Sequence, residues 1–166
     1  YAGMSFVDFA HLKERNIKNG ILDYNRQKTG TPMRLEILDT AELMRKELMG
    51  DKRPASGYLF PFLSGTKTGY EAYLEYNAAL SRFNRNLKAL KKAAGIASEV
   101  TSYTIRHSFA MALKEQNVPI EMISELLGHK SIKTTQIYLR SFSLEKMTEV
   151  NSTCFGCVYN YVSKVG

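Results

Sequence analysis

Between residues 101 and 139 the chain carries three short apolar patterns at helical spacing, separated by two strong breaks. Pro119 is suited to the first position of a helix, because its missing N–H is not needed there. Gly128 lies just past an apolar stripe and can adopt the left-handed conformation that ends a helix. This segment is therefore predicted to form three short helices joined by sharp turns.

The residues able to do chemistry lie at the edges of these helices. Ile105 and Phe109 define an apolar face of the first helix, which predicts that Arg106 and His107 lie off that face. The turn at Gly128 would direct the next residue, His129, beyond the end of the second helix. The third helix, which Ser131 can cap, carries Tyr138 in its last turn.

Arg106, His129 and Tyr138 offer three different chemical functions. An arginine fork matches two oxygens of a phosphate, and a histidine can donate to a third oxygen or move a proton. A phenol can act as a nucleophile, but with a pKa of about 10 it needs positive charge and a base nearby. The stretch supplies both, so it is suited to nucleophilic attack on a phosphate.

Residues 20–38 change to a period of two, with a turn at residues 29–32. On its first strand, Leu22, Tyr24 and Arg26 alternate with Ile21, Asp23 and Asn25, as expected for a β-hairpin. Lys28 lies at its tip in the sequence K-T-G. Taken alone, this residue is one more solvated lysine on a turn.

Three elements together resemble the catalytic core of the tyrosine recombinases, the phage integrase family. They are R-H-S-F-A at residues 106–110, L-L-G-H at 126–129, and a tyrosine nine residues after that histidine. The resemblance extends over about residues 3–150 and is similar in detail to integrases of bacterial mobile elements. It implies an α+β, mainly α fold with a small antiparallel sheet beside a helical core. It also implies that residues 1–166 are the catalytic domain of a longer protein with an N-terminal DNA-binding region.

The same resemblance implies a role for four residues. Tyr138 would attack the scissile phosphorus and form a 3′-phosphotyrosyl bond, while Arg106 would clamp the non-bridging oxygens. His129 would hydrogen-bond the phosphate and assist Tyr138, and Lys28 would protonate the leaving 5′ oxygen. Because the covalent intermediate retains the bond energy, no cofactor and no metal are expected.

Two positions depart from the family pattern. Ser5 stands where the family carries the first of two phosphate-holding arginines, although Asp8 matches the acidic residue that follows it. Tyr103 stands three residues before Arg106, where most members carry a histidine or lysine. Losing one phosphate-clamping cation can cost on the order of 10²-fold in rate. Another arginine, either Arg15 or one upstream of this sequence, would have to replace it.

A polyanionic partner is expected from the formal net charge of +7. The helix predicted over residues 70–94 adds a basic face suited to a phosphate backbone, formed by Arg82, Arg85, Lys88, Lys91 and Lys92. The expected partner is double-stranded DNA, and the resemblance adds a homotetramer on DNA with accessory DNA-bending proteins. No apolar run reaches the roughly 18 residues of a membrane span, so a cytoplasmic location without membrane contact is expected.

Other functions stay open from the sequence. Residues 116–140 have the apolar spacing and turn glycine of a helix-turn-helix regulator. Ser5 and Tyr103 fit a recombinase relative that binds DNA without cleaving it, and tyrosine chemistry also fits a topoisomerase-like enzyme. Cys154 and Cys157 are interpreted as small apolar residues of an aromatic tail rather than as half of a zinc site. Three aromatic residues of this tail would complete the core or contact a neighbouring subunit: Phe155, Tyr159 and Tyr161.

Overall fold

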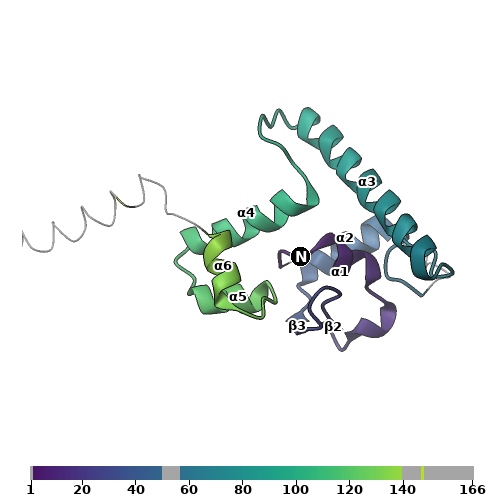
Figure 1. Cartoon of the computed structure of the whole chain (residues 1–166), viewed down its shortest axis with the longest axis horizontal. Helices are drawn as coiled ribbons and strands as arrows, with labels where there is room; N and C mark the ends of the chain where they lie inside the picture. Colours follow the sequence, from purple (N-terminus) through teal and green to yellow (C-terminus); the bar gives the residue numbers. More distant parts are fainter. Residues whose placement is uncertain (1, 50–56, 140–146, 148–166) are drawn as a thin grey trace, which may run out of the picture.

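The computed structural model describes residues 2–49, 57–139 and 147 (Figure 1). The predicted aromatic tail and its two cysteines lie outside these residues. The fold is mainly α with a small antiparallel sheet, as predicted from the sequence. Its elements are, in chain order, α1 (Phe6–His11), the 3-10 helix η1 (Glu14–Asn16), β1 (Ile17–Lys18), β2 (Ile21–Asn25), β3 (Pro32–Glu36), α2 (Asp39–Met49), α3 (Gly69–Ala93), α4 (Ser102–Glu115), α5 (Ile120–Leu126) and α6 (Ile132–Tyr138).

The predicted hairpin is formed by β2 and β3, and the short β1 pairs with the other side of β2. Tyr24 lies opposite Met33, and both side chains are buried. The connecting loop is closed by Arg26, whose N–H donates to the Thr31 carbonyl at 2.9 Å and whose carbonyl accepts from Gly30 at 2.8 Å. Lys28 is exposed on this loop. The loop of the hairpin therefore exposes Lys28, while the face that carries Leu22, Tyr24 and Met33 is buried.

An aromatic cluster joins α1 to α3. The ring centroid of Phe6 lies 4.7 Å from that of Phe83 on α3 and 5.3 Å from that of Phe62. Not all apolar residues of α3 are buried: Leu74 and Leu90 are 48% and 65% exposed. Partners from α1 and the segment before α3 reach only one side of the long helix. That side carries Tyr76, Ala79, Leu80 and Phe83.

The helices α4, α5 and α6 pack around a separate apolar core, which consists of Ala110, Ile123, Leu127 and Leu139 with their neighbours. Thr101 caps α4, since its side chain accepts from the Thr104 N–H. The buried face of α4 was predicted wrongly: Arg106 is only 7% exposed, whereas Ile105 is 46% exposed. Arginine can be buried here because backbone carbonyls accept its hydrogen bonds.

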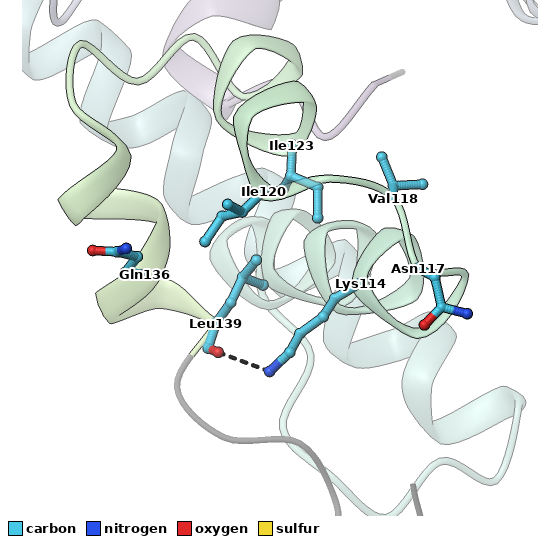
Figure 2. A pocket seen from close by; sticks show the side chains of 7 residues that line it. All are labelled: Lys114, Asn117, Val118, Ile120, Ile123, Gln136 and Leu139. Carbon is cyan, nitrogen blue, oxygen red and sulfur yellow. Dashed lines mark hydrogen bonds between the residues drawn. The ribbon is translucent and has the colours of Figure 1, made fainter. Parts of the chain in front are cut away.

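A pocket of about 450 Å³ opens between these three helices (Figure 2). Lys114, near the end of α4, is buried there, and its Nζ donates to the Leu139 carbonyl at 2.9 Å. Leu139 directly follows Tyr138, so this hydrogen bond holds the end of α6 against α4.

Figure 1 shows α4, α5 and α6 gathered on one side, with α1, α2 and the hairpin beside them. Two buried arginine side chains connect these parts: Arg106 reaches the Gly3 carbonyl and Arg26 reaches the Gly128 carbonyl. Within the described residues, no helix is both long and apolar enough to cross a membrane.

Candidate active site

Arg106 is fixed by backbone groups from two distant parts of the chain. Its Nη1 donates to the Gly3 carbonyl at 2.6 Å, and its Nη2 donates to the Leu127 carbonyl at 2.5 Å. Gly3 has a φ of +62°, and a Cβ there would lie 2.6 Å from Phe109 Cδ1. Glycine is thus required at this position, because it must lie close to Phe109 for its carbonyl to reach Arg106. Burial lowers the pKa of Arg106, and the neighbouring Arg26 lowers it further.

His129 lies directly beside this guanidinium. Its Nε2 is 3.4 Å from Arg106 Nη2, and its Nδ1 is 2.8 Å from Thr135 Oγ1. Burial, followed by the charges of Arg106, Arg26 and Lys28, lowers the pKa of His129 from 6.5 to about 4. The imidazole is therefore neutral at physiological pH.

Tyr138 lies in an aromatic and imidazole environment at the end of α6. Its ring centroid is 5.1 Å from that of His107, 5.6 Å from that of Tyr103 and 5.9 Å from that of His129. Its hydroxyl is buried and forms no hydrogen bond with any described residue. Burial raises the pKa of Tyr138 to about 12, Tyr103 contributes to the rise, and Arg106 opposes it. The phenol is therefore protonated in the free protein.

Arg26 is a site residue that the sequence analysis did not single out. Its Nε donates to Asp8 Oδ2 at 3.1 Å, and its Nη1 donates to the Gly128 carbonyl at 2.9 Å. Asp8 is 2% exposed and also accepts from the Ser5 hydroxyl at 2.5 Å and the Gln27 N–H at 2.7 Å. This buried ion pair places a second guanidinium close to Arg106 and His129.

A signal for Arg26 was present in the sequence. In the period-two pattern of the hairpin, Arg26 follows Leu22 and Tyr24 on the face that is buried. A charged residue on a buried face needs a partner, and Asp8 is the acid that the family pattern placed nearby. Arg15, the alternative that the sequence suggested, is exposed in η1.

The structure brings three of the four predicted residues together: Arg106, His129 and Tyr138. Lys28 lies on the exposed loop of the hairpin and is near enough to lower the pKa of His129. With Arg26 and Arg106 it surrounds the imidazole with positive charge, which favours an anionic group such as a phosphate. In the described part of the chain, no group of three His, Cys, Asp or Glu side chains could hold a metal ion.

Sequence comparison matches residues 2–145 to the family model described as "Phage integrase family". The chain is 50% identical over 54 residues to the tyrosine recombinase XerD of Lacticaseibacillus casei. This match covers 32% of this chain and 18% of that protein. It is 41% identical over 75 residues to the tyrosine recombinase XerC of Rickettsia typhi, covering 45% of this chain and 24% of that protein. The matched segments thus span less than a quarter of these relatives.

Solved structures share the fold at low sequence identity. The XerA recombinase gives a TM-score of 0.67 at 23% identity, covering 92% of this chain and 54% of that one. The Tn1549 transposon integrase in complex with a circular intermediate DNA gives 0.64 at 15% identity, covering 91% and 55%. The XerH recombinase bound to a palindromic difH substrate, a post-cleavage complex, gives 0.64 at 20% identity, covering 92% and 42%. The similarity extends over most of this chain and about half of each of the other chains.

Proposed function

Because this chain belongs to the phage integrase family, we propose that residues 1–166 are the catalytic domain of a site-specific tyrosine recombinase. The domain would cleave and rejoin double-stranded DNA through a 3′-phosphotyrosyl intermediate. The observation that supports this most directly is the position of Tyr138. Its ring packs 5.9 Å from that of His129, which in turn lies 3.4 Å from the fixed guanidinium of Arg106. A nucleophile, a base and a phosphate-binding cation are thus adjacent.

The phosphate is held by fixed cations. Arg106 supplies the charge that the family pattern assigns to it, and Arg26 supplies the charge missing at Ser5. Both guanidinium groups are already oriented by backbone carbonyls, and Arg26 is oriented by Asp8 as well. Such preorganised donors stabilise charge in the transition state without reorganisation at the moment of reaction.

The reaction then transfers two protons. As the Tyr138 oxygen bonds to phosphorus, its proton moves to Nε2 of the neutral His129. As the bond from phosphorus to the 5′ oxygen breaks, Lys28 donates a proton to that oxygen. A bound phosphate offsets the surrounding positive charge and so raises the pKa of His129 from its low value, which makes it a better base when substrate is present.

The partners in this proposal are double-stranded DNA and three further copies of the protein. Arg82, Arg85, Lys88 and Lys92 are exposed along α3 and would contact the DNA backbone. A homotetramer around two duplexes would exchange strands, with accessory DNA-bending proteins shaping the site. The XerH and Tn1549 integrase structures are complexes with DNA, which supports the choice of partner.

Covalent trapping tests the proposed chemistry. The full-length protein carrying this domain is incubated with a nicked suicide substrate that contains its attachment site, and DNA–protein adducts are separated on a denaturing gel. We expect an adduct that disappears in Tyr138→Phe and persists in Tyr70→Phe, since Tyr70 is 73% exposed on α3. Site-specific binding without an adduct would instead indicate a relative that binds DNA and has lost cleavage, which Ser5 and Tyr103 would explain.

A further inference from the structure

The contacts of His129 determine which ring nitrogen carries the proton. Arg106 Nη2, 3.4 Å from Nε2, can only donate a hydrogen bond, because guanidinium has no acceptor. Nε2 must therefore present its lone pair, and in the neutral ring the proton is on Nδ1. That nitrogen lies 2.8 Å from Thr135 Oγ1, so the N–H donates to the threonine hydroxyl.

Thr135 is well placed to hold this arrangement. It is fully buried, with 0% exposure, and it lies on α6 three residues before Tyr138. Its hydrogen bond therefore ties the imidazole, which comes from the turn after α5, to the helix that carries the nucleophile. A buried imidazole N–H without a partner would carry a desolvation cost. The hydroxyl can accept as well as donate, so it satisfies the Nδ1–H that the contact with Arg106 requires.

We propose that Thr135 is a positioning residue that holds His129 as the Nδ1-protonated neutral imidazole and directs its Nε2 lone pair toward Arg106 and the phosphate site. The inference rests on the proposed function, since the Nε2 lone pair, which faces Arg106 in the free protein, is the one that receives the Tyr138 proton. The opposite tautomer would place an N–H against the Arg106 N–H groups and could accept nothing at Nε2. Arg106 and Thr135 together thus set the tautomer from which the reaction starts.

The tautomer can be read directly by NMR of protein labelled with ¹⁵N in its histidine rings. The chain has three histidines, and the His129 signals are assigned by their loss in His129→Gln. At neutral pH we expect the wild-type ring to show the Nδ1–H pattern. Thr135→Val should shift the ring to the Nε2–H form or to a mixture, and Thr135→Ser should restore Nδ1–H because it keeps the hydroxyl.

Thr134→Val is the matched control, because it makes the same chemical change one residue earlier at an exposed position. In the trapping assay we expect adduct formation to fall roughly 10-fold or more in Thr135→Val, a loss similar to that seen when the hydrogen-bond partner of a metal-bound histidine is removed. Thr135→Ser and Thr134→Val should retain most of the wild-type rate. Rescue by serine separates a hydroxyl effect from a loss of packing.

An Nε2–H pattern in the wild-type protein would overturn the proposal, and this measurement does not depend on the folding of any Thr135 variant. A Thr135→Val variant that keeps both the tautomer and the adduct rate would overturn it as well. If the wild-type protein forms no adduct, the proposed function fails, while the ring spectra still decide whether Thr135 sets the tautomer.

Discussion

Arg26 is the residue on which the proposed site most depends, because it stands in for a charge that the family pattern places at residue 5. Its pairing with Asp8 is buried, and removing one partner of a buried ion pair leaves a costly unpaired charge. An alanine variant would therefore lose stability, on the order of 3–5 kcal/mol, as well as any catalytic role. Lysine keeps the charge but lacks the fork that reaches Asp8 and Gly128 together.

We expect Arg26→Lys to lower the rate of adduct formation by on the order of 10²-fold while site-specific DNA binding is largely kept. Arg34→Lys is the matched control, because Arg34 is exposed on the neighbouring strand β3. Urea unfolding of both variants would show how much of the stability is retained. A folded Arg26→Lys protein with the wild-type cleavage rate would contradict the assignment of Arg26 to the phosphate.

His129 makes the stability of the fold depend on pH. The folded protein protonates this ring near pH 4 and the unfolded chain near 6.5, so the unfolded state binds more protons in between. The free energy of unfolding should therefore decrease as the pH falls from about 7 to about 4. For this residue the change is on the order of 1–3 kcal/mol.

Urea denaturation at several pH values would test this dependence. The His129→Gln variant lacks the titrating ring, so its stability should fall less over the same range, whereas contributions from other groups cancel in the comparison. Parallel curves for the two proteins would mean that the folded state does not disfavour the imidazolium.

At the level of the elements, the turn between α5 and α6 has little space for an added side chain. Gly128 has a φ of +62°, and a Cβ there would overlap Arg26 Cδ and lie 2.6 Å from Met33 Sδ. Gly128→Ala should cost about 1–2 kcal/mol for the left-handed conformation and about 1–3 kcal/mol more for the overlap. It should also reduce cleavage, because Arg26 must move.

Gly95→Ala separates the two costs of that substitution. Gly95 has a φ of +66°, and a Cβ there would meet nothing within 4 Å. It should show only the conformational cost in urea unfolding and leave cleavage unchanged. Equal losses of stability in both variants would mean that Arg26 does not pack closely against the turn.

The end of α6 depends on the hydrogen bond from Lys114 to the Leu139 carbonyl. Lys114→Met keeps much of the side-chain volume but removes the donor, so we expect a loss of about 1–3 kcal/mol. Because Tyr138 precedes Leu139, cleavage should fall as well, even though Lys114 is not proposed to touch DNA. Lys133→Met, at an exposed position on α6, is the control. If both variants behaved alike in unfolding and cleavage, the hydrogen bond would not hold the helix end.

At the scale of the whole molecule, the sequence predicted the elements better than their contacts. The hairpin, the three C-terminal helices and the turn at Gly128 follow from local patterns, and the structure contains them. The burial of Arg106 does not follow, because the Gly3 carbonyl that accepts its hydrogen bond is 103 residues away in the chain. Arg26 was missed for the same reason: its partners Asp8 and Gly128 lie on α1 and after α5.

The positive charge of the whole protein should act mainly through one face of α3. Arg85, Lys88 and Lys92 are exposed at helical spacing, whereas Lys91 is paired with Glu99 at 3.2 Å. If the three contact phosphates, changing all of them to Gln should weaken DNA binding for every sequence. It should also lower the slope of log affinity against log salt by about 2–3, since each contact contributes roughly 0.9.

Fluorescence anisotropy over a range of salt concentrations would measure this slope with attachment-site DNA and with unrelated DNA. A control triple variant removes the same charge from exposed positions outside α3: Arg15→Gln, Lys18→Gln and Lys46→Gln. Its slope should stay close to that of the wild type, because these side chains need not contact phosphates. Equal decreases of the slope in the two triple variants would show that net charge governs binding. The basic face of α3 would then not be the surface that contacts the phosphates.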